Sequence, residues 1–128
     1  MSVAFRSSRN FKVWQYSVSD GRLLLRSPRP RGGDTRVDVQ FTGVRLMLLR
    51  PTYDGLTIRP ASADERDLLL NRYGIDAAQG QIHILGRGLA SFVVSGGVQW
   101  HEDSDPEGDP SWLGPPGGRG PRAGSAGS

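Results

Sequence analysis

Hydrophobic and polar residues alternate along much of the chain, and this period of two is typical of half-buried β-strands. In residues 11–19, Trp14, Tyr16 and Val18 fall on one face, and the residues between them are polar. Alternating patterns or short apolar runs predict further strands at residues 23–27, 35–41, 44–49, 56–59, 81–85, 90–95 and 98–101. The pattern therefore predicts a mainly β protein with antiparallel strands.

The first two predicted strands are separated by an Asp-Gly pair at residues 20–21. This pair favours a two-residue type I′ hairpin turn, because both of its residues tolerate positive φ. The turn would place Tyr16 opposite Leu25 and would give one continuous apolar face across the hairpin. The rings of Trp14 and Tyr16 are therefore predicted to lie in the core with Leu23 and Leu25.

One helix is predicted over residues 63–73. Ser62 and Glu65 have the spacing of a capping box, and Gly74 can supply the left-handed residue that ends many helices. Three turns of helix are not stable alone, so the helix is expected to bury apolar side chains against the sheet: Leu69, Leu70 and Tyr73. The expected fold is α+β, mainly β, with an antiparallel sheet, a β-sandwich or a partly open barrel of about seven or eight strands and one helix.

The chain divides into a polar N-terminal segment at residues 1–10, a single β-rich domain at residues 11–102 and a tail at residues 103–128. In the tail, acidic residues alternate with proline and glycine, and a Gly/Pro-rich stretch follows. Such a composition does not compensate the entropy of ordering, so the tail is predicted to be disordered. Within it, Trp112 and Leu113 are the residues that could dock on the domain.

Composition limits the chemistry that the chain can perform. The 128 residues include no cysteine, which excludes disulfides, thiolate metal sites and cysteine nucleophiles. The longest apolar run, residues 46–49, is far shorter than the roughly 20 residues that span a bilayer. Residues 1–9 lack the apolar stretch of a secretory signal, so a cytoplasmic location is expected.

Charge is distributed unevenly along the chain. Residues 1–50 contain ten cationic and three acidic residues, whereas residues 51–128 contain six cationic and ten acidic ones. Four arginines in and around the loop after the first hairpin are predicted to bind an anionic partner: Arg26, Arg29, Arg31 and Arg36. A solvated hairpin loop is the alternative. The acidic tail could also fold back and compete for this basic surface.

Other candidate sites are weaker. His83 and His101 have no recognisable catalytic or metal-binding context, and His83, which alternates with isoleucines, is predicted to point to the surface. The acidic run at residues 103–109 starts like a calcium loop but lacks the glutamate of the twelfth position. The glycines at 86 and 88 favour a hairpin turn over a phosphate-binding loop. No metal or cofactor is predicted.

A set of strand and turn residues resembles a group of small uncharacterised bacterial β-rich proteins. The resemblance covers about a third of the chain and is carried by Trp14, Tyr16, Val18, Ser19, Gly21, Leu23, Leu24, Leu25, Arg26, Ser27, Asp38, Phe41, Gly43 and Val44. That group carries no assigned activity, cofactor or catalytic motif. The resemblance therefore implies a fold class and no functional residue.

The first functional hypothesis is a small non-enzymatic binding or accessory domain, regulatory or immunity-like, that contacts an acidic protein partner through the four arginines. The alternative is nucleic-acid binding by the Arg-rich N-terminal half. The second alternative is an enzyme whose residues converge only in the fold, for example Asp38, Asp54 or Glu65 with His83. The hypotheses include no membrane partner, and the oligomeric state is open.

Overall fold

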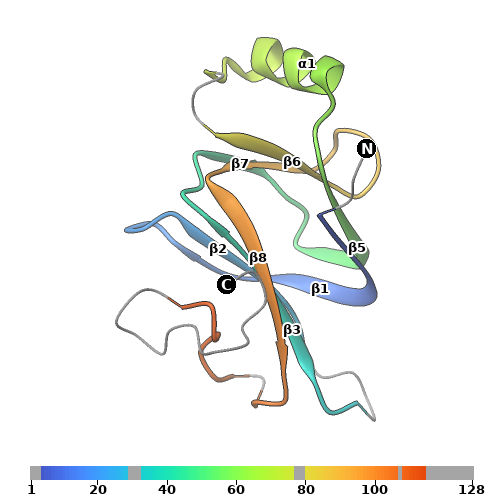
Figure 1. Ribbon diagram of the computed structural model, residues 1–128, viewed down its shortest axis with the longest axis vertical. Helices are drawn as coiled ribbons and strands as arrows, with labels where there is room; N and C mark the ends of the chain where they lie inside the picture. The colour runs from blue at the N-terminus through green and yellow to red at the C-terminus, as the bar shows by residue number, and fades with distance from the viewer. Residues whose placement is uncertain (1–3, 29–32, 77–79, 107, 115–128) are drawn as a thin grey trace.

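Eight antiparallel strands and one helix make up the described chain. The structure is a computed structural model that describes residues 4–28, 33–76, 80–106 and 108–114. The elements follow in the order β1 (Phe5–Ser17), β2 (Arg22–Ser27), β3 (Arg36–Thr42), β4 (Leu46–Leu48), β5 (Thr52–Pro60), α1 (Ala63–Tyr73), β6 (Gln81–Leu85), β7 (Phe92–Ser95) and β8 (Gly97–Asp103). This architecture confirms the prediction of a mainly β protein with one helix (Figure 1).

The strands form one strongly curled sheet with the order β4-β7-β6-β5-β1-β2-β3-β8. β3 continues into β4 after a bend at Gly43, and β7 continues into β8 through Gly96. At this corner the Gly96 amide donates to Thr42 and the Arg45 amide donates to Val94, each at 2.8 Å. The pairs β3–β8 and β4–β7 are therefore one bent ribbon, and this ribbon brings the two ends of the sheet together.

Two apolar clusters result from this curl. The larger one fills the inside of the sheet and includes Phe11, Leu25 and Phe41, all with no exposed surface. The second lies between α1 and the other face of β6 and β7, where Leu69 of the helix packs with Ile84. β6 is consequently buried on both faces.

The β1–β2 hairpin differs from its prediction. Its connection spans residues 18–21, so Tyr16 lies opposite Leu23 instead of Leu25, and a bulge places Trp14 outside the regular register. A bulge adds one residue to a strand and shifts the faces of the residues that follow. The rings of Trp14 and Tyr16 are 38% and 36% exposed, so the prediction that both lie in the core is wrong.

The helix has the predicted bounds and caps. The Ser62 hydroxyl accepts a hydrogen bond from the Glu65 amide at 3.2 Å. A carboxylate oxygen of Glu65 accepts one from the Ser62 amide at 2.9 Å. The Gly74 amide, at φ +64°, donates to the Leu70 carbonyl. Leu69 is fully buried as predicted, whereas Tyr73 remains 44% exposed although its ring touches that of Phe92.

Replacing Ser62 by alanine is expected to lower the free energy of unfolding by about 1 kcal/mol, because the Glu65 amide then loses its acceptor. Urea unfolding followed by circular dichroism measures the change. Ser62→Asp keeps a capping oxygen and should stay within about 0.5 kcal/mol of the native chain. Equal losses for both substitutions would show that the cap does not stabilise this helix.

Candidate functional site

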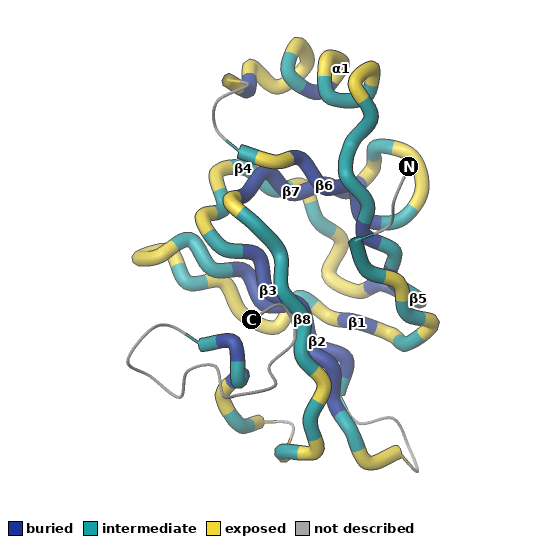
Figure 2. The backbone as a smooth tube through the Cα atoms, viewed as in Figure 1, coloured by how far each residue is buried: buried dark blue, intermediate teal, exposed yellow. Residues whose placement is uncertain are grey.

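The outer face of β2, β3 and β8 carries polar side chains that are nearly inaccessible to water. Five consecutive residues of β2 and six of β3 are buried, which requires cover on both faces of these strands (Figure 2). The inner face packs in the core, and the C-terminal residues cover the outer one. We call the outward-facing set Arg26, Arg36, Asp38 and Gln40 the arginine face, and residues 104–114, of which 107 is outside the description, the strap.

Arg26 and Asp38 form a buried ion pair at the centre of the arginine face. The two residues are opposite each other on β2 and β3, and their side chains are 1% and 0% exposed. Arg26 Nε donates to Asp38 Oδ1 at 2.6 Å, and Nη2 donates to Oδ2 at 3.0 Å. The guanidinium also lies 4.9 Å from the ring centroid of Trp14 and donates to the Asp109 carbonyl at 3.1 Å. The bulge in β1 thus stacks an indole on the pair.

Arg36 connects the sheet to the strap. Its fully buried guanidinium donates through Nε to Asp103 Oδ1 at 2.8 Å. Nη1 donates to the carbonyls of Pro106 at 2.9 Å and Asp109 at 2.7 Å, and Nη2 donates to that of Pro110 at 3.0 Å. One side chain therefore binds a carboxylate of β8 and three main-chain carbonyls of the strap.

The downstream half of the strap adds two apolar anchors. Leu113 is 4% exposed, and the side-chain amide of Gln40 donates to its carbonyl. The Trp112 indole donates to Asp105 Oδ2 at 2.7 Å, and its ring lies 5.8 Å from that of His101. These contacts fix the strap across β3 and β8, at the opposite end of the molecule from α1 (Figure 1).

The strap corrects two predictions. Residues 103–106 and 108–114, expected to be disordered, lie on the sheet because buried arginines supply partners for their carbonyls and carboxylates. Arg26 and Arg36, predicted to bind an anionic partner, are covered by that same segment. Arg29 and Arg31, and residues 115–128 of the tail, lie outside the described residues.

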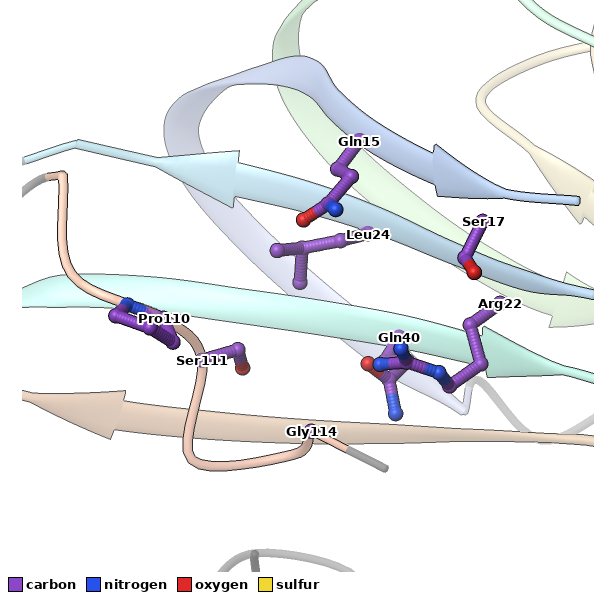
Figure 3. A pocket seen from close by; sticks show the side chains of 8 residues that line it. All are labelled: Gln15, Ser17, Arg22, Leu24, Gln40, Pro110, Ser111 and Gly114. Carbon is purple, nitrogen blue, oxygen red and sulfur yellow. The ribbon is translucent and has the colours of Figure 1, made fainter. Parts of the chain in front are cut away.

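A cavity of about 250 Å³ remains between the strap and the β1–β2 hairpin (Figure 3). Leu24 and Gln40 lie on its sheet side, and the hairpin and the strap form its walls. The remaining lining residues are Gln15, Ser17, Arg22, Pro110, Ser111 and Gly114. The cavity adjoins the arginine face because Leu24 is opposite Gln40 on the neighbouring strand.

His83 points away from its neighbouring isoleucines, as the alternation indicates, but not to the surface. The isoleucines face α1, so the opposite face of β6 is the inside of the curled sheet, where the His83 ring lies 6.2 Å from that of Phe41. The side chain is buried, and Nδ1 has no hydrogen-bond partner among the described residues. Burial lowers the pKa of His83 below its ordinary value of 6.5.

The buried imidazole is expected to make stability depend on pH. Since the pKa of His83 is depressed on folding, the unfolded chain binds the proton more readily. Stability is therefore complete above about pH 6.5 and falls at lower pH, by at most about 1.4 kcal/mol per pH unit. Urea unfolding at pH 7.5 and 5.5 measures this loss. His83→Leu should reduce it and His101→Gln should retain it; an undiminished loss in His83→Leu would contradict the assignment.

The other candidate catalytic residues do not assemble with His83. Asp38 is on the outer face and is paired with Arg26. Glu65 forms a bidentate pair with Arg59, which together with the capping amide of Ser62 lowers the pKa of Glu65 to about 2. Within the described ranges, no three His, Asp or Glu side chains are placed to hold a metal ion.

The remaining sequence patterns have structural roles. The glycines at 86 and 88 lie in the connection between the antiparallel strands β6 and β7, as the predicted hairpin requires. In the run that starts like a calcium loop, Asp103 binds Arg36 and Asp105 accepts the Trp112 indole. In the part of the chain that the structure describes, no helix is long and apolar enough to cross a membrane.

Comparisons with protein-family models, with curated protein sequences and with solved structures give no match to this chain. The fold and the covered arginine face are therefore the observations from which a function is argued. The alternation of Arg36, Asp38 and Gln40 with apolar residues indicates one polar face of β3. In the sequence, only the apolar residues Trp112 and Leu113 indicate that a later segment covers this face.

Proposed function

We propose that this protein is a non-enzymatic interaction domain that binds an acidic, turn-forming segment of a partner protein on its arginine face. The observation that carries this proposal is the set of contacts that Arg36 makes with the strap. It donates to the carbonyls of Pro106, Asp109 and Pro110, and its Nη2 lies 3.8 Å from the Asp105 carboxylate. A site of this kind binds the main chain of a folded-back segment, and the strap occupies it as an intramolecular ligand.

The contacts divide into general and selective ones. Main-chain carbonyls are present in any peptide, so the bonds from Arg26, Arg36 and Gln40 hold the backbone of the ligand without selecting its side chains. The ion pair between Arg36 and Asp105, at 3.8 Å, favours an acidic residue near the start of the ligand. The buried side chain of Leu113 adds one apolar anchor. The preferred ligand is therefore acidic at its start and apolar near its end.

Binding explains the arginine face better than folding does. The core lies inside the curl and against α1, so these side chains do not contribute to either apolar cluster. Removing a buried ion pair such as Arg26–Asp38 from water costs free energy that well-packed apolar residues would not require. The free-energy cost of burying these charges is understandable if the strap that covers them can be replaced by a segment of another protein.

The strap and a partner segment would compete for the same surface. A tethered segment acts at an effective concentration in the millimolar range, so a partner binds only if it is more complementary or if the strap is loosened. Weakening the strap at a residue that does not belong to the arginine face should therefore increase binding of an added peptide. Leu113 is such a residue, since its side chain belongs to the strap and not to the core.

The test uses the full chain with Leu113→Ser and a fluorescent peptide with the sequence of residues 103–114. Anisotropy should show saturable binding to this variant and at least tenfold weaker binding to the native chain, because the native strap competes. Arg36→Lys in the Leu113→Ser background should reduce this binding, since lysine cannot reproduce the planar set of donors. The matched control is Arg87→Lys, an exposed arginine in the β6–β7 connection.

Circular dichroism and thermal unfolding establish that each variant is folded. Binding that is unaffected by Arg36→Lys, or the absence of binding to folded Leu113→Ser at millimolar peptide, would refute the proposed function. Labelled RNA of the same charge serves as a further probe. RNA binding that exceeds peptide binding would favour the nucleic-acid alternative instead.

A further inference from the structure

The strap does not fill the whole groove on the outer face. After Pro110 it turns back, with the Gly114 amide donating to the Ser111 carbonyl at 3.2 Å and the Leu113 amide to the Ser111 hydroxyl at 3.1 Å. The cavity of about 250 Å³ lies beyond this turn, toward the β1–β2 hairpin (Figure 3). A segment that follows the strap and then continues without turning would enter it.

The far wall of the cavity is polar and includes a guanidinium. Arg22 contributes it, and its Nε forms an ion pair with Asp20 Oδ2 at 2.7 Å. Among the described residues, Nη1 and Nη2 of Arg22 and the side-chain amide of Gln15 have no hydrogen-bond partner, so both side chains can donate into the cavity. The Ser17 hydroxyl beside them lies 3.3 Å from that of Ser19, and the eight lining residues include no carboxylate.

The cavity lies on the same row of side chains as the arginine face. Arg26, Leu24 and Arg22 occupy alternate positions of β2, and alternate side chains of a strand share one face. The outer face thus presents Arg26 to the centre of the strap, Leu24 to the turn and Arg22 to the space beyond. A ligand that runs along this row meets a second arginine after its apolar anchor.

From this arrangement, and resting on the proposed function, we infer that the cavity is a subsite for a carboxylate of the partner segment, located one or two residues after the position of Leu113. The guanidinium of Arg22 and the side-chain amide of Gln15 match a carboxylate, and the volume suits one side chain.

The experiment compares two amidated peptides on the full chain with Leu113→Ser. Both contain the sequence of residues 103–113, followed by Gly-Glu in one and by Gly-Gln in the other. The glutamate peptide should bind about tenfold more tightly, as expected for one charge-assisted hydrogen-bonded pair. Adding Arg22→Gln should remove the difference between the peptides, whereas the control Arg87→Gln should preserve it.

The outcomes separate this inference from the proposed function. Equal affinities of the two peptides for the chain that retains Arg22 would overturn the carboxylate subsite and leave the peptide-binding function intact. A preference for glutamate that persists after Arg22→Gln would also overturn it, because the charge would then be recognised elsewhere. Failure of both peptides to bind would refute the function together with the subsite.

Discussion

Replacing Asp38 by alanine is expected to lower the free energy of unfolding by about 3 to 5 kcal/mol, because it removes the carboxylate that forms a bidentate ion pair with a buried arginine. Arg26 is 1% exposed and donates two hydrogen bonds to this carboxylate. Two of its other contacts, with the Asp109 carbonyl and the Trp14 ring, involve groups without a formal charge. The loss should appear as a lower urea midpoint with the transition slope unchanged.

A companion variant separates the ion pair from packing. Arg26→Met with Asp38→Leu removes both charges and replaces them with apolar side chains, so it should recover most of the stability lost in Asp38→Ala. The same double variant should lose strap contacts and bind the peptide of residues 103–114 weakly, even after Leu113→Ser. A loss below about 1 kcal/mol for Asp38→Ala would mean that water reaches Arg26.

Replacing Gly80 by alanine is expected to cost about 3 kcal/mol or more, because two effects act together. Gly80 has φ +140°, a conformation that residues with a Cβ rarely adopt. An added Cβ would also clash with the Ser95 carbonyl oxygen, and the Ser95 carbonyl carbon would lie 3.0 Å away. The clashing atoms of Ser95 belong to the main chain and cannot rotate away like a side chain. The start of β6 must therefore move away from β7.

Gly88→Ala is the matched control for this prediction. Gly88 has φ +67°, and a Cβ added there meets no atom within 4 Å. Its substitution should therefore cost only the conformational penalty, about 1 to 2 kcal/mol. Thermal and urea unfolding of both variants measure the difference. Equal losses would show that the approach of Gly80 to Ser95 does not strain the alanine variant.

The sequence was sufficient for the elements that depend on local chemistry. The capping box at Ser62 and the glycine at 74 predict the helix bounds, because caps act within one turn. Alternation locates the strands, and the polar row of β3 from Arg36 to Gln40 follows from it. The hairpin register was missed because the Asp-Gly pair predicts a two-residue turn, whereas the connection spans residues 18–21. The bulge at Trp14 was missed because the pattern remains periodic on both sides of it.

The candidate site was predicted only in part, because it depends on contacts between distant segments. Arg26 and Arg36 were predicted to be anion-binding residues. In the fold, Arg26 pairs with Asp38, and Arg36 binds Asp103 of β8 and the carbonyls of the strap. The strap was predicted to be disordered because an argument from composition considers only the burial of apolar side chains. It does not include hydrogen bonds from arginines to main-chain carbonyls. The position of His83 was missed because alternation indicates the face of a strand but not whether that face is covered.

The order of the strands in the sheet also bears on synthesis at the ribosome. β3 pairs with β2 on one side and with β8 on the other, and β8 is the last strand within the described residues. Until it emerges, the nascent chain exposes an open strand edge of the kind that recruits other chains. Arg36 and Asp38 place opposite charges on that strand, so the side chains covered in the finished molecule would oppose aggregation before it is complete.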